Sequence, residues 1–127
     1  VSEAPGHGVQ VLNLASLKDI SSTSPQIFTA DYVIGNSSAH NIAINEDSGM
    51  VYIVGQRGCP IGMTIFNPRT GLQPGCFGDF GYVHDANCII YAGPDVRFLN
   101  QEICALFTPR GIGGGVKIVS VGVTNSS

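Results

Sequence analysis

The stretch GYVHDANCIIYAGPD, residues 81–95, contains the residue types that bind metals or carry out nucleophilic chemistry. His84, Asp85 and Cys88 lie within five residues of one another, directly before an apolar run. Imidazole and carboxylate groups can share a divalent cation, and a thiol beside an imidazole can act as a nucleophile. The stretch is therefore either a reactive site or the start of a buried strand. The rest of the sequence is needed to distinguish these two interpretations.

The chain has only three histidines, His7, His40 and His84, and each opens or precedes a short apolar segment. Asn41 and Asp85 follow the last two histidines at matching positions. Two interpretations stay open. His40, His84 and Asp85 could converge on a divalent metal, or the imidazoles could tie the start of each strand to a neighbour by hydrogen bonds. A catalytic role lacks a coherent set of partner residues, since no G-x-S-x-G, H-E-x-x-H or P-loop is present.

Acidic side chains in glycine-rich loops are a second candidate for cation binding. Asp79, Asp85 and Asp95 lie close together in sequence, and Ca²⁺ favours oxygen ligands from such loops. The chain has no D-x-D-x-D-G run, however, and aspartate is common in turns. The segment GIGGG leads into a β-rich segment rather than a helix, so no helix N-terminus would face a phosphate.

Composition restricts the class of protein. With 127 residues the chain makes one domain or less. Charged residues make up 12%, against about 25% in ordinary proteins. The net charge of −3 and the lack of a basic cluster argue against nucleic acid as a partner. The longest apolar runs have about five residues, far short of the roughly 20 that span a bilayer.

Short β-rich segments separated by turn residues dominate the chain. Helical periodicity is limited to residues 14–20, which could make one or two turns with Ser16 as the cap. Residues 46–49 form a typical hairpin turn, in which Gly49 can adopt a positive φ. The segments expected as strands are VQVLNL, HNIAINED, MVYIVG, MTIFNP, NCIIYAG, EICALF and VKIVSVGV.

An internal repeat organises these segments. GVQVLNL, GMTIFNP and GVKIVSV recur about every 54 residues, and HNIAIN and HDANCIIY recur in step with them. The unit is strand, hairpin, strand, loop, strand and a weaker fourth strand such as GLQPGCFGD. This length and strand content predict the blades of an all-β, antiparallel β-propeller, with a β-sandwich as the alternative. The expected division is the end of one blade in 1–34, a full blade in 35–82 and most of a third in 83–127.

A closed propeller needs about four to eight blades, so we expect an incomplete ring in this chain. The missing strand partners would come from the rest of a longer protein or from other copies of the chain, since open edge strands invite pairing. The chain starts at Val1 without the features of a signal peptide, which indicates a mature or excised segment.

The four cysteines allow three pairings. We expect Cys59–Cys76 and Cys88–Cys104, because each bridge would then join neighbouring strands of one blade and close a loop of about 16 residues. A Cys-His metal site lacks the C-x-x-C spacing. A nucleophilic Cys88 conflicts with its expected oxidation.

Four fragments together resemble the secreted choice-of-anchor B proteins, which are built from LVIvd propeller repeats. They are SEAPGHGVQVLNL, SAHNIAINEDSGMVYIVG, GCFGDFGYVHDANCIIYAGPD and QEIC, and they cover roughly residues 2–107 in the right order and spacing. Beyond Phe107, TPRGIGGG stands where that family has a short polar turn. The resemblance implies a β-propeller, export, and attachment to a cell surface or matrix. It implies no established enzymatic activity or ligand.

These observations predict an extracellular or cell-surface module that is structural or adhesive, non-enzymatic, without a resident cofactor and able to self-assemble. The even cysteine count fits an oxidising compartment. Asn36 and Asn125 each begin an N-glycosylation acceptor tripeptide, so N-glycans are expected partners. The alternative is a metal-dependent binding or hydrolytic domain centred on His40, His84 and Asp85.

Overall fold

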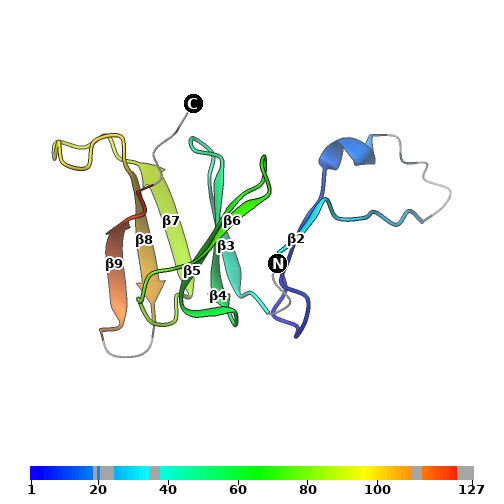
Figure 1. The fold of residues 1–127 in the computed structure, drawn as a ribbon, viewed down its shortest axis with the longest axis horizontal. Helices are drawn as coiled ribbons and strands as arrows, with labels where there is room; N and C mark the ends of the chain where they lie inside the picture. The colour runs from blue at the N-terminus through cyan, green and yellow to red at the C-terminus, as the bar shows by residue number, and fades with distance from the viewer. Residues whose placement is uncertain (19, 21–24, 35–37, 110–112, 123–127) are drawn as a thin grey trace.

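The computed structural model describes residues 1–18, 20, 25–34, 38–109 and 113–122. They form three antiparallel sheets of two, four and three strands (Figure 1). The all-β prediction is thus confirmed. The first sheet pairs β1 (Val9–Val11) with β2 (Tyr32–Ile34); the second has the order β3 (Asn41–Asn45), β4 (Met50–Gln56), β5 (Cys59–Asn67), β6 (Leu72–Phe77); the third has the order β7 (Asp85–Ile90), β8 (Glu102–Thr108), β9 (Gly115–Ser120).

Every segment that was expected as a strand overlaps one, β5 begins four residues before MTIFNP, and the weaker segment GLQPGCFGD contains β6. β7 begins two residues earlier than expected, at Asp85. β2 was not predicted, because its three residues are too few to show an alternating pattern. It forms because it pairs with β1, with Val9 opposite Ile34.

The one described helix is a 3₁₀ helix, η1 (Leu14–Leu17). The expectation that Ser16 caps it is wrong. The N-cap is Asn13, whose side-chain oxygen accepts a hydrogen bond from the Ala15 N–H at 2.9 Å. Asparagine is a preferred N-cap because its side chain reaches the free N–H groups of the first turn.

The predicted hairpin between β3 and β4 is confirmed. Asn45 pairs with Met50 across the turn, and Gly49 has a φ of 71°. The Asn45 side-chain oxygen accepts from the Asp47 N–H at 3.1 Å, which holds the start of the turn.

The repeat is visible in the strand order. GMTIFNP lies in β5 and GVKIVSV in β9, and each is the third strand of its sheet. GVQVLNL contains β1, which pairs with β2 as β5 pairs with β6. The described residues form no closed ring, so the assignment of the sheets to propeller blades, with the boundaries 1–34, 35–82 and 83–127, stays a prediction.

The three sheets pack face to face in series, with the four-stranded sheet in the middle (Figure 1). One face of the middle sheet carries Tyr52, Val54 and Met63, which pack against Cys104 and Leu106 of the third sheet. The opposite face carries Val51, Ile53 and Phe66, which pack against Val9 and Ile34 of the first sheet. Burial of such side chains stabilises the fold by about 1.5–3 kcal/mol each.

The predicted disulfide pairing is confirmed. Cys59–Cys76 joins β5 to β6, and Cys88–Cys104 joins directly opposed residues of β7 and β8. Two disulfides are consistent with an oxidising, extracellular location.

Candidate functional site

The two histidines that open β3 and β7 meet at one end of the sheets. β3 and β7 lie in contact, and His40 and His84 directly precede them. Their Nε2 atoms are 2.9 Å apart, and their ring centroids are 4.2 Å apart with the ring planes tilted by 54°. The predicted convergence of these two side chains is therefore present in the structure.

Both histidines occupy the same place in their sheets. The His40 N–H donates to the Val54 carbonyl at 3.2 Å, and the His84 N–H donates to the Phe107 carbonyl at 2.8 Å. Val54 lies opposite the residue after His40, and Phe107 lies opposite the residue after His84. The repeat therefore places one imidazole from the second sheet and one from the third sheet side by side.

A carboxylate completes the cluster, because Glu3 contacts the Nδ1 atom of His40. The backbone near Glu3 is held by the Ala39 N–H, which donates to the Ser2 carbonyl at 2.8 Å. Sequence reasoning did not find Glu3, since 37 positions separate it from His40 and no local pattern connects them.

The absence of a side chain at Gly55 leaves the space that His40 occupies. Gly55 has a φ of 61°, and a Cβ atom there would lie 2.5 Å from the His40 Cβ and 2.9 Å from the Tyr82 hydroxyl. Real side chains do not tolerate either distance. Only glycine at position 55 allows His40 and Tyr82 to approach the strand as they do.

Asp85 bridges the two sheets. The Asn41 amide nitrogen donates to the Asp85 Oδ1 atom at 3.1 Å, and the same oxygen accepts from the Ala86 N–H at 2.8 Å. Within the described ranges, no group of three or more His, Cys, Asp or Glu side chains is placed to hold a metal ion. The 2.9 Å between the His40 and His84 Nε2 atoms fits the hydrogen-bonding interpretation of the imidazoles, and Asp85 bonds Asn41 rather than joining the two rings as a third ligand.

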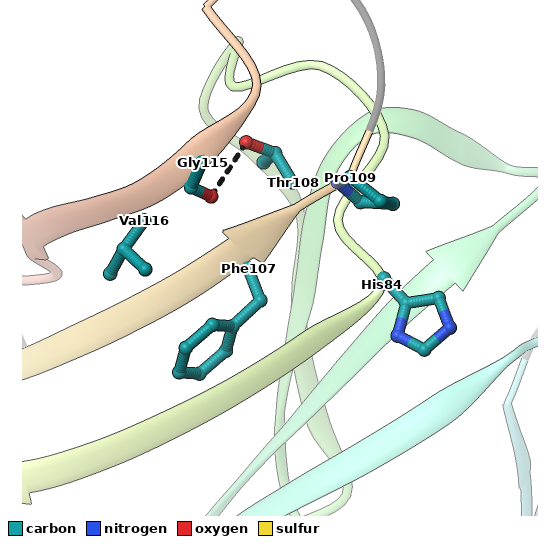
Figure 2. A pocket seen from close by; sticks show the side chains of 6 residues that line it. All are labelled: His84, Phe107, Thr108, Pro109, Gly115 and Val116. Atoms are coloured by element: carbon teal, nitrogen blue, oxygen red, sulfur yellow. Dashed lines mark hydrogen bonds between the residues drawn. The ribbon is translucent and has the colours of Figure 1, made fainter.

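A hollow of about 420 Å³ opens beside His84. Figure 2 shows the side chains around it, with the Thr108 hydroxyl donating to the Gly115 carbonyl at 3.1 Å. His84 is the one titratable group among the residues that line it. The full lining is His84, Phe107, Thr108, Pro109, Gly115 and Val116.

A second polar cluster, centred on Glu102, was missed by sequence reasoning. The Glu102 side chain is fully buried, and its Oε1 atom accepts from the Asn45 amide at 2.6 Å and from the Ser48 hydroxyl at 2.9 Å. The Glu102 Oε2 atom and the Tyr52 hydroxyl are buried without a hydrogen-bond partner among the described residues. The available signal was alternation, since Glu102 shares its face of β8 with the buried Cys104.

Tyr52 provides a pH-dependent prediction. Burial, and secondly the nearby Glu102 carboxylate, raise the pKa of Tyr52 far above 10. In the unfolded chain a tyrosine loses its proton near pH 10. Above that pH the unfolded state binds fewer protons than the folded state, so stability falls by about 1.4 kcal/mol per pH unit from this group.

We therefore expect the urea midpoint to be insensitive to Tyr52 ionisation below about pH 9 and to fall with rising pH above about pH 10. The Tyr52→Phe variant should lose this part of the slope. An identical alkaline slope in both proteins would contradict the assignment.

The remaining residues singled out in the sequence lie apart from the His40–His84 cluster or outside the described residues. Asp95 forms an exposed ion pair with Arg97, which lowers the pKa of Asp95, and it accepts the Arg97 N–H as turn aspartates do. Asp79 and His7 are exposed. The glycosylation acceptors Asn36 and Asn125 lie outside the described residues.

No helix in the described part of the chain is long and apolar enough to cross a membrane. In comparisons with known proteins, no family model, curated protein or solved structure matches the chain.

Proposed function

We propose that the protein is a non-enzymatic, extracellular structural or adhesive module, a β-propeller segment of the choice-of-anchor B type whose incomplete blades are completed by further units of the same kind. Its function lies in its surfaces and edges. The supporting features are the stacked antiparallel sheets, the two disulfides and the polar pairs that join one sheet to the next. Both Asn41–Asp85 and Asn45–Glu102 connect the second sheet to the third.

The observation that carries this proposal is an uncovered apolar face on the third sheet. Phe107 pairs with Val116, and Ala105 pairs with Ile118, so these side chains share one face of β8 and β9. Ile89 lies on the same face of β7, opposite Ile103. Val116 is 60% exposed and Ile118 67% exposed.

The corresponding face of the middle sheet is covered. Aligning β5 with β9 at their glycines places Met63 at the position of Val116 and Ile65 at that of Ile118. Met63 is 0% exposed and Ile65 4% exposed, because the third sheet packs over them. The same position in the repeat is therefore buried in one sheet and open in the next.

An apolar face of this kind marks an interaction surface. The middle sheet indicates its occupant, which is another antiparallel sheet with an apolar face. In the isolated chain that occupant is a second copy, so we expect association through the Phe107, Val116 and Ile118 face.

Sedimentation velocity over a range of concentrations tests the proposal. The parent chain should form species larger than the monomer, whose share rises with concentration, and Ile118→Asp should remain monomeric because a buried charge is costly. Ile27→Asp is the matched control, since Ile27 is 98% exposed and lies outside this face, and it should associate like the parent. A parent that stays a compact monomer, or an Ile118→Asp variant that still associates, would overturn the proposal.

A further inference from the structure

We infer that His40 and His84 form a binding site for one divalent late transition-metal ion, of the Cu²⁺ and Ni²⁺ class, with Glu3 as the residue that orients His40. The inference goes beyond the structural role proposed above and does not depend on it. It rests on the relative placement of the two imidazoles, on the carboxylate behind one of them and on the open space beside the other.

The two rings meet at an angle rather than head-on. A straight N–H···N bond of 2.9 Å would place the ring centroids about 5.2 Å apart, given an imidazole radius of about 1.15 Å. Two imidazoles bound to one metal at about 2.05 Å and roughly 90° would have Nε2 atoms about 2.9 Å apart and centroids about 4.5 Å apart. The observed values for His40 and His84 are 2.9 Å and 4.2 Å. The centroid distance is therefore shorter than a straight hydrogen bond would give and nearer to that of two ligands of one metal, while the Nε2 separation fits a bent hydrogen bond as well.

Glu3 sets the chemistry of His40. Its carboxylate contacts Nδ1 of His40, so the neutral ring carries its proton on Nδ1 and presents a lone pair on Nε2. Histidine ligands of metals ordinarily donate their other N–H to a carboxylate or carbonyl in this way, which fixes the ring and raises its basicity. Glu3 thus has the position of an outer-sphere partner.

The site is open enough for an ion to enter. The His40 side chain is 27% exposed, and His84 is exposed and lines the hollow of about 420 Å³. No third His, Cys, Asp or Glu ligand is placed there by the described residues, so water completes the coordination. Imidazole nitrogens, a bite angle near a right angle and open positions favour Cu²⁺ or Ni²⁺ over tetrahedral Zn²⁺.

Titration with Cu²⁺, followed by electron paramagnetic resonance and calorimetry, tests the inference on the whole chain. All four cysteines are in disulfides, so no thiol competes for the ion or reduces it. The parent should bind one Cu²⁺ with micromolar affinity and show coupling to two nitrogens. His40→Ala and His84→Ala should each bind at least about tenfold more weakly and lose one nitrogen.

Two further variants sharpen the test. His7→Ala is the matched control, because it removes the one histidine outside the pair and should leave Cu²⁺ binding unchanged. Glu3→Gln should keep two coordinating nitrogens while binding about tenfold more weakly, since Glu3 acts through His40. Urea unfolding of each metal-free variant, and His84→Asn as a second replacement, separate loss of the site from loss of the fold.

Three outcomes would overturn the inference: a parent chain without stoichiometric binding below about 1 mM Cu²⁺, retention of full affinity in folded His84→Ala, or loss of binding in His7→Ala. A parent that associates through the third sheet but binds no Cu²⁺ overturns this inference alone. A monomeric parent that binds Cu²⁺ through both histidines supports it while contradicting the assembly.

Discussion

Removing both disulfides, in a variant with all four cysteines changed to alanine, is expected to lower the free energy of unfolding by about 6 kcal/mol. The bridges join residues 17 and 16 positions apart, and closing a loop of that size is worth about 3 kcal/mol in the chain-entropy model. Small domains are stable by only about 5–15 kcal/mol. We therefore expect the variant to lose a large part of its stability and to unfold at a much lower urea concentration than the parent.

The two bridges should not contribute equally. Cys88 and Cys104 are both buried in the cluster between the second and third sheets, so Cys88→Ala/Cys104→Ala loses packing as well as the cross-link. Cys76 is exposed, so reductant should open the Cys59–Cys76 bridge first.

Urea unfolding of the parent, each double variant and the four-alanine variant measures these effects. Adding reductant to the four-alanine variant is the control, since it has no bridge to break and its midpoint should not move. An unchanged midpoint in fully reduced parent protein would contradict the expectation.

Replacing Asn45 by alanine is expected to lower the free energy of unfolding by about 3 kcal/mol. The Asn45 amide donates to the fully buried Glu102 carboxylate at 2.6 Å, and the Glu102 Oε2 atom already lacks a partner within the described part of the chain. Ser48 would be left as the remaining side-chain donor to that carboxylate. A buried carboxylate that loses a donor costs more than the hydrogen bond itself contributed.

The matched control is Asn41→Ala, at the other end of β3. Asn41 also donates across the two sheets, but its partner Asp85 is only half-buried, so we expect a loss of about 1 kcal/mol. The double variant Asn45→Ala/Glu102→Gln should recover part of the loss, because a neutral amide is less costly to bury with fewer partners. A midpoint for Asn45→Ala within experimental error of the parent would show that Glu102 does not depend on this donor.

The sequence predicted much of the fold because its signals are local. Short β-rich runs between turn residues indicated seven of the nine described strands, the repeat unit indicated the weaker β6, and Gly49 indicated the turn between β3 and β4. The cysteine pairing followed from bridges expected between neighbouring strands of one unit. The sequence was not sufficient where the signal was too short, as in the three residues of β2, and the expected cap Ser16 was wrong because Asn13 caps η1.

The amino-acid sequence alone predicted all but one of the described strands, the disulfide pairing and the repeat that places His40 and His84 at equivalent positions, because these depend on neighbours along the chain. Only the tertiary structure decided that Glu3 stands behind His40, that Asn45 supports a buried Glu102 57 positions away, and that Asp85 bridges two sheets. These contacts join segments that are distant in sequence. They depend on how one sheet packs against the next, and local periodicity carries no information about that packing.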